Sequence, residues 1–171
     1  THRKDPIFRH MQATWFPDHQ PLITLPMEAT YYNRLRNTQG NTNVLDVFVP
    51  PWASQFLMIV QVEATWDGQI NDMLMSALSG PNLHVKTVIA VDEDVDIYDA
   101  EDILWAVATR CDPAQHVRIQ PGSRLHPLDA IIPEVGDEYT VMRIGGKMGI
   151  DATKPATWRK EERQKFKRVD P

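Results

Sequence analysis

Lys86–Pro113 has the sequence KTVIAVDEDVDIYDAEDILWAVATRCDP, and this stretch decides the fold that the chain is expected to adopt. From Val85 to Val91 the residues are mostly β-branched and apolar, which predicts a short strand buried on both faces. Four acidic residues crowd the end of this strand: Asp92, Glu93, Asp94 and Asp96. From Asp99 onward, apolar residues recur at one-face helical spacing, at Ile103, Leu104, Val107, Ala108 and Cys111. A strand, an acidic turn and a helix in this order form a unit from which α/β domains are built.

The ends of the predicted helix carry residues that suit them. Asp99 stands where an N-cap belongs, and Glu101 and Asp102 place negative charge in the first turn, where the helix dipole favours it. Arg110 places positive charge in the last turn, and Pro113 prevents the helix from continuing. We therefore expect a helix over residues 99–110.

Hydrophobic periodicity places three further elements upstream of this unit. Two strands are expected at 44–49 and 57–64, and the short link between them, which contains Pro50-Pro51, favours antiparallel pairing. A helix is expected at 68–79, with an apolar face formed by Ile70, Met73, Leu74, Ala77 and Leu78. The predicted fold class is α/β, a mixed sheet with packed helices, followed by a long loop and a C-terminal helix.

The remaining sequence gives weaker patterns. Leu22–Leu25 is predicted as a short strand, Met27–Arg36 as a helix, and Val117–Ile119 as a brief strand. Residues 121–139 are rich in proline and predict a long connection, and Gly145–Gly149 predicts a tight backbone excursion. A basic helix is expected within residues 158–168. These patterns divide the chain into three parts: 1–40, a linker region and helix; 41–120, an α/β domain; and 121–171, a C-terminal loop and basic helical tail.

Composition limits the class of protein. The chain has 171 residues, enough for one ordinary domain, and its net charge of −5 argues against a nucleic-acid-binding protein. It has a single cysteine, which cannot form an internal disulfide and fits a reducing, cytoplasmic compartment. No apolar run approaches the roughly 18 residues of a membrane span, so no membrane partner is expected. The chain starts at Thr1 without an initiator Met, and we expect it to begin in the middle of a longer protein.

Each candidate site has a structural alternative. Asp92, Glu93 and Asp94 are suited to bind Mg²⁺, but a solvated acidic turn is the favoured interpretation. Cys111 has His116 nearby as for a thiol nucleophile, yet its place on the apolar stripe favours a core residue. Gly145–Lys147 resembles a phosphate-binding loop only in part, and a structural turn is favoured. The six histidines show no metal-ligand spacing. The basic tail is either a solvated face or a segment that docks on an acidic neighbour.

Three segments resemble one known family when they are taken together. The segment VIAVDEDVDIYDAEDILWAVATRCDP, residues 88–113, and the later KMGIDATK, residues 147–154, resemble the UbiD family of decarboxylases. The opening THRKDPI, residues 1–7, resembles a family segment that lies just downstream of the active-site region. The three segments occur in the family's order and are spread over most of the chain.

This resemblance implies the chemistry of a larger enzyme. Members catalyse reversible, non-oxidative decarboxylation of aromatic or α,β-unsaturated acids with prenylated FMN, a divalent metal (Mn or Mg) and, in some members, potassium. Their flavin, metal, catalytic arginine and paired carboxylates belong mainly to an N-terminal and central portion whose motifs are not found in this sequence. The resemblance therefore implies that this chain is the C-terminal, mainly oligomerising domain, with no catalytic residue and no metal ligand of its own. Its expected partners are the remainder of the enzyme, the aromatic acid substrate and copies of itself, as a dimer or hexamer.

The resemblance extends to two candidate cofactor-binding residues. In some members a lysine and an arginine from the C-terminal half approach the flavin phosphate and a nearby monovalent cation. The positions that match best here are Arg110 and Lys86, and a guanidinium suits phosphate recognition. The structural alternative for each is an ordinary cation at the end of a helix or a strand.

Two other functions stay open at this point. The fold can serve a stand-alone scaffold or binding module without chemistry. A weaker alternative treats Asp92–Asp94 as the phospho-acceptor cluster of a receiver domain, although the lysine and threonine that complete such a site are not evident. Four large aromatic residues exceed what one small core needs and favour protein–protein contacts: Trp52, Phe56, Trp66 and Trp105.

Overall fold

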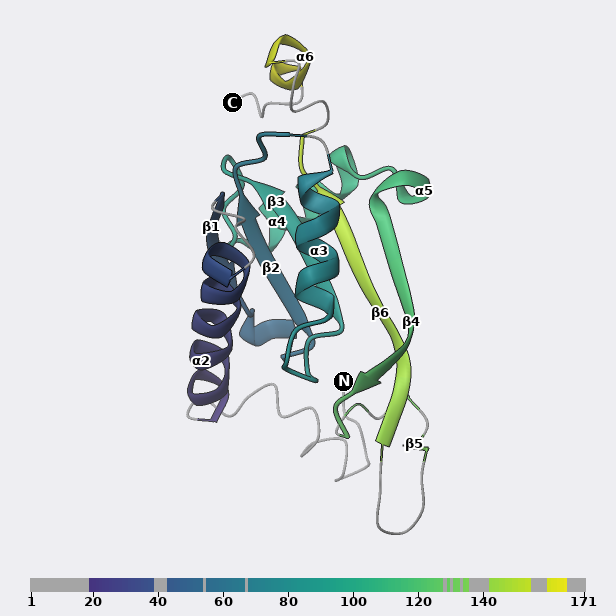
Figure 1. The fold of residues 1–171 in the computed structure, drawn as a ribbon. Coiled ribbons are helices and arrows are strands. Elements are labelled where there is room, and N and C mark those ends of the chain that lie inside the picture. The colour runs from purple at the N-terminus through teal and green to yellow at the C-terminus, as the bar shows by residue number, and fades with distance from the viewer. Residues whose placement is uncertain are drawn as a thin grey trace.

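The fold is built around a mixed β-sheet with helices on both faces (Figure 1). The computed structural model describes residues 19–38, 43–53, 55–66, 68–127, 129, 131–132, 134–135, 142–154 and 160–165. The first 18 residues, which include the family-like segment 1–7, lie outside the described part of the chain. The strands are β1 (Val44–Phe48), β2 (Leu57–Val62), β3 (Thr87–Asp92), β4 (Val117–Leu125), β5 (Glu134–Val135) and β6 (Met142–Ala152).

The strand order is β1-β2-β3-β6-β4, and β5 pairs with β6 outside this path. Strands β2, β3 and β6 are parallel and form the centre of the sheet. Strands β1 and β4 are antiparallel to their neighbours. This arrangement confirms the predicted mixed sheet and the predicted antiparallel pairing of the first two strands.

Helices cover the two faces of the sheet unequally. The helices are α2 (His19–Asn33), α3 (Gln69–Leu78), α4 (Ala100–Arg110), α5 (Pro113–His116) and α6 (Lys160–Gln164), with a π-helical turn at Arg34–Thr38 and a 3₁₀ turn at Pro51–Ala53. Helices α2 and α3 lie on one face, α4 lies on the opposite face, and α6 lies beyond one end of the sheet (Figure 1). No described helix is long and apolar enough to cross a bilayer.

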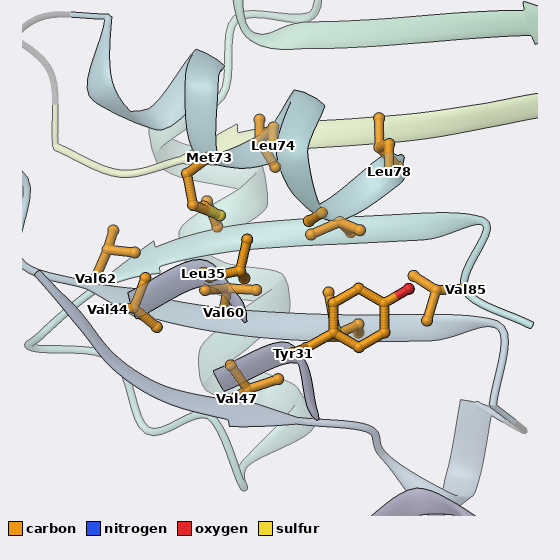
Figure 2. Packing of buried hydrophobic residues seen from close by; sticks show 14 of the residues in the cluster. Tyr31, Leu35, Val44, Val47, Val60, Val62, Met73, Leu74, Leu78 and Val85 are labelled. Atoms are coloured by element: carbon orange, nitrogen blue, oxygen red, sulfur yellow. The ribbon is translucent and has the colours of Figure 1, made fainter. Parts of the chain in front are cut away.

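Alternation along the strands separates two cores. On the face of α2 and α3, Tyr31 and Leu35 pack among Val44, Val60 and other buried side chains (Figure 2). On the other face, the core comprises Ile59, Ile89, Val91, Val95, Ile97, Ile103, Ala106 and Ala152. Since β2 and β3 contribute to both cores, their near-continuous apolar sequences have a physical reason.

The predicted core face of α3 is confirmed, and that of α4 is confirmed only in part. In α3, Ile70, Leu74 and the rest of the predicted face are buried. In α4, Ile103 is buried and Val107 packs against the second core. Leu104 and Ala108 were expected on the same stripe, but Leu104 is 62% exposed and Ala108 is exposed as well. The buried side of α4 comprises Asp102, Ile103, Ala106 and Arg110, and Leu104 and Ala108 lie outside it.

The structure corrects three predictions made from the sequence. Leu22–Leu25 belongs to α2 and not to a strand. The strand that begins at Val117 continues through Pro121-Gly122 to Leu125, with an irregular register between Gln120 and Ser123. Gly145–Gly149 lies within β6 and is not a tight excursion. Strand β6 passes under α3, where a Cβ at Gly149 would lie 3.3 Å from Leu74 Cβ, so glycine permits a close helix–strand approach there.

Gly80 is a second position where the chain needs a residue without a side chain. A Cβ at this position would lie 2.4–2.7 Å from ring and hydroxyl atoms of Tyr31, whose side chain is fully buried. We expect Gly80→Ala to lower the free energy of unfolding by about 1–3 kcal/mol, because Tyr31 must shift within a packed core. Urea unfolding measures this change. The control Gly146→Ala meets only Gln120 O, at 4.0 Å, and an equal loss in both variants would contradict the explanation.

Candidate functional site

Six charged side chains from four segments meet at the C-terminal end of β3, and we refer to them as the ion cluster. They are Asp92, Glu93 and Asp94 at the strand end, Arg110 in the last turn of α4, Lys154 after β6, and Arg163 in α6. Helix α4 begins as predicted, with the Asp99 side chain accepting a hydrogen bond from the backbone N–H of Glu101. Arg110, the last residue of α4, lies beside Asp92 at the end of β3.

Asp92 is the most buried member of the ion cluster, with no exposed side-chain surface. Its Oδ1 lies 2.5 Å from Nη2 of Arg163, and its Oδ2 accepts a hydrogen bond from the backbone N–H of Lys154. Nη1 of Arg110 lies 3.8 Å from Oδ2. Both oxygens of this carboxyl are thus engaged by groups of the chain itself.

Arg110 is fixed by two parallel hydrogen bonds to Asp94. Its Nη1 and Nη2 donate to the two Asp94 carboxylate oxygens at 3.0 and 2.8 Å. The guanidinium also lies over the Trp105 ring, 4.9 Å from its centroid, and its side chain is only 1% exposed. A bidentate pair of this kind is geometrically specific, so Arg110 joins α4 rigidly to the turn after β3.

Lys154 bridges the carboxylates of Glu93 and Asp94. Its Nζ lies 3.0 Å from Glu93 Oε1 and 3.3 Å from Asp94 Oδ1. The ion cluster therefore contains three carboxylates and three basic side chains, a balanced set of charges.

Burial and ion pairing have opposite effects on the pKa values of the three acids, and the net shift differs among them. Burial raises the pKa of Asp92 from 3.8 to about 6, although the backbone of Lys154 and the charge of Arg163 act against it. Burial also raises the pKa of Glu93 and of Asp94, but bonds to backbone N–H, Lys154 and Arg110 outweigh it, and both pKa values are lowered. Asp92 is thus the member of the cluster that gains a proton first on acidification.

The ion cluster is a set of paired charges and not a solvated turn. The favoured interpretation of Asp92–Asp94 as a solvated acidic turn is wrong, because Asp92 is buried and all three acids are paired with basic side chains. Among the described residues, no three or more His, Cys, Asp or Glu side chains converge as a metal would need. The Mg²⁺ interpretation therefore finds no support in the described part of the chain.

The two candidate cofactor-binding residues lie at opposite ends of β3. Lys86 directly precedes the strand, and Asp92, beside Arg110, ends it. Since a strand rises about 3.3 Å per residue, the Cα atoms of Lys86 and Asp92 are roughly 20 Å apart. Lys86 Nζ pairs with Asp129 Oδ2 at 2.8 Å and lies over the Phe56 ring. The structure therefore does not bring Arg110 and Lys86 together.

The other candidate residues have structural roles. Lys147 is buried and its Nζ donates to Leu78 O at the end of α3, 2.8 Å away, so the Gly145–Lys147 segment is no open phosphate loop. Cys111 caps the end of α4 and is half-buried, and burial raises the pKa of its thiol, which disfavours the thiolate. Nδ1 of His116 accepts a hydrogen bond from the backbone N–H of Asp112.

A second group of interacting side chains lies beside Lys86. The imidazole rings of His84 and His126 stack with centroids 3.7 Å apart, and the backbone N–H of His126 donates to Leu83 O. Burial and the neighbouring His126 lower the pKa of His84 to about 4, and burial lowers the pKa of His126. Folding thus favours the neutral form of both rings.

Acidification should therefore weaken this contact. The pKa of His84 is lower in the folded chain than its ordinary 6.5, so its stabilising contribution is complete above pH 6.5 and is lost as pH falls toward 4. Because His84 is only partly buried, we expect a loss on the order of 1 kcal/mol between pH 7 and 4.5. His84→Phe keeps an aromatic ring but cannot take up a proton, so urea unfolding should show a smaller pH dependence for this variant. An unchanged pH dependence would contradict the assignment.

Known proteins match most of the length of this chain. The family model UbiD_C, described as the 3-octaprenyl-4-hydroxybenzoate carboxy-lyase C-terminal domain, matches residues 20–152. The apo 3,4-dihydroxybenzoic acid decarboxylase of Enterobacter cloacae is 30% identical with a TM-score of 0.74, covering 89% of this chain and 31% of that chain. The UbiD-class enzyme HmfF of Pelotomaculum thermopropionicum with FMN is 29% identical with a TM-score of 0.67, covering 84% and 29%. An evolved dimeric form of HmfF is in complex with prFMN.

The vanillic acid decarboxylase of Sedimentibacter hydroxybenzoicus in its closed form is a further match. It is 26% identical with a TM-score of 0.65, and the match covers 88% of this chain and 30% of that chain. The chain thus spans about 30% of the length of the solved structures it matches.

Proposed function

Because the chain belongs to the UbiD family of carboxy-lyases, matching its C-terminal domain, we propose that it completes a decarboxylase that acts on an aromatic or α,β-unsaturated carboxylic acid with prenylated FMN. The observation that carries this proposal is the family match over residues 20–152. The structural matches support it, since two are decarboxylases of aromatic acids by name and a third is a UbiD-class enzyme complexed with FMN.

Within this proposal, the larger part of the enzyme holds the flavin, its divalent metal (Mn or Mg) and, if it follows those members that use it, potassium. The described residues offer no phosphate cradle by themselves, because Arg110 is paired with Asp94 and Lys86 with Asp129. The flavin would supply the electron sink that decarboxylation requires. A contact of Arg110 or Lys86 with the flavin phosphate stays part of the proposal. Lys86 is the more accessible of the two, with a side chain 26% exposed against 1% for Arg110.

Assembly is the second part of the proposal. We propose that residues 41–120 form the oligomerisation domain and contact either the rest of the enzyme or a second copy, as a dimer or hexamer. Trp52 and Trp66 support this assignment, since they are 50% and 52% exposed, whereas aromatic side chains of this size are usually covered. Among the matched structures, a dimeric form of HmfF is consistent with an oligomeric enzyme. A cytoplasmic location, expected from the single cysteine, stays a prediction.

Affinity purification of the chain from its native cell tests the proposal. The expected result is a larger polypeptide in the same peak, or the chain as part of one, identified by intact mass, together with a flavin absorption band. A chain of 19.6 kDa without a flavin band and without a further polypeptide would contradict the proposal and favour a scaffold or binding module.

A further inference from the structure

Arg163 connects the C-terminal helix to the sheet in the described part of the chain. Its Nη2 lies 2.5 Å from Asp92 Oδ1 and 3.4 Å from Glu93 Oε2, and its Nη1 donates to Ala64 O at 3.3 Å. The three acceptors lie just after β2 and at the end of β3, so one guanidinium touches the C-terminal ends of two parallel strands. The Arg163 side chain is only 13% exposed.

The charge of the ion cluster depends on this residue. Without Arg163, the three acids Asp92, Glu93 and Asp94 face two basic side chains among the described residues, Arg110 and Lys154. Asp92 has the most to lose, because its Oδ1 is bonded to Arg163 while its Oδ2 already accepts from the Lys154 backbone. A buried carboxylate with one oxygen lacking a donor is costly, and this cost favours attachment of Arg163.

We propose that Arg163 is an electrostatic latch that holds α6 on the C-terminal end of the sheet, and that loss of the Asp92 charge releases it. This proposal concerns the chain's own C-terminal segment and does not depend on the decarboxylase function. The C-terminal edge of a parallel sheet is where ligands and partners of α/β domains usually bind. The latch thus determines whether α6 stays at this edge.

The response to pH follows from the groups that face Asp92. They are Arg110 from α4, Lys154 from the segment after β6, Arg163 from α6, and the adjoining Glu93. Burial and the charge of Glu93 raise the pKa of Asp92, whereas Arg163 and Lys154 lower it. Burial has the largest effect, and the resulting pKa is about 6. Since attachment of Arg163 favours the ionised carboxyl, protonation weakens attachment by linkage. Because Arg163 lowers the pKa of Asp92, detachment leaves this buried carboxyl with a pKa above 6. Attachment is therefore strongest well above pH 6 and weakens as pH falls toward 6.

Hydrogen exchange of residues 160–165, measured by mass spectrometry on the full chain with any polypeptide that co-purifies, tests the latch. Arg163→Gln removes the charge and should speed exchange of this segment by about tenfold or more at pH 7.5, as expected for loss of charged hydrogen bonds. Lys165→Gln removes one positive charge two residues away, at an exposed site, and should leave exchange unchanged. Arg163→Lys keeps the charge and should restore part of the protection.

The pH arm compares the wild type at pH 7.5 and pH 5, each relative to the same peptide in the unfolded chain. Protection of residues 160–165 should fall at pH 5 in the wild type and change little in Arg163→Gln, whereas protection of β3 should persist in both. Equal loss in Arg163→Gln and Lys165→Gln would overturn the proposal. Protection that rises with protein concentration would also overturn it, because α6 would then be held by a second copy.

Discussion

Arg110→Met should lower the free energy of unfolding by about 3–5 kcal/mol, the cost typical of removing one partner from a buried ion pair. The guanidinium is buried, and it makes two hydrogen bonds with Asp94 and lies 3.8 Å from the buried carboxyl of Asp92. Methionine fills a similar volume but leaves both acids with less compensation. It also removes the contact between the guanidinium and the Trp105 ring.

Urea unfolding at pH 7.5, followed by circular dichroism, measures this loss. Arg124→Met is the matched control, because Arg124 is an exposed residue of β4, and its replacement should change stability by less than about 0.5 kcal/mol. The double variant Arg110→Met, Asp94→Leu removes both partners of the bidentate pair and should be more stable than Arg110→Met alone. A loss in Arg110→Met no larger than in Arg124→Met would mean that the ion cluster does not stabilise the fold.

The unit from β3 to α4 could be predicted because its signals are local. A continuous apolar run, an aspartate at the N-cap and a change of period lie within 28 residues, and each agrees with the structure. The same holds for α3, whose apolar face follows the helical period. Where the sequence and the tertiary packing agree, short-range reasoning is sufficient.

Strand β6 could not be predicted in this way. Its sequence includes three glycines, an arginine and a lysine, and no alternation indicates a strand. It is a strand because β3 and β4 pair with its two edges, and because Gly149 permits a close approach to α3. In the same way, Pro26 disfavoured a helix upstream, yet α2 runs through it. The stability of both elements comes from residues distant in the sequence.

The ion cluster was found only in part for the same reason. The acids and Arg110 were visible in the sequence, but their pairing was not, since Lys154 and Arg163 lie 62 and 71 residues after Asp92. Asp129, the partner of Lys86, lies in a segment without a recognisable pattern. A charged side chain's partner becomes evident only when the topology is known.

The 171 residues alone should release no CO₂ from any aromatic or cinnamic-type acid and should retain no prenylated FMN of useful affinity. Decarboxylation without oxidation leaves a developing carbanion, which needs an electron sink stronger than ordinary side chains provide. It also needs a general acid close to the reacting carbon. Asp92 has a pKa of about 6, the range of such an acid, but it is buried and both of its oxygens are bonded within the chain.

Complementation separates this explanation from simple misfolding. The chain is mixed with the N-terminal portion of the enzyme, expressed separately, and prenylated FMN; CO₂ release and the flavin absorption band are then measured. The mixture should recover both signals, since the proposed role of this domain is to complete the enzyme, and Arg110→Met should recover less because it weakens the fold. Turnover by the chain alone, after mass spectrometry has excluded a second polypeptide, would contradict this prediction. It would place the active site among side chains of this domain. The acids of the ion cluster would then have to leave their ion pairs to take part.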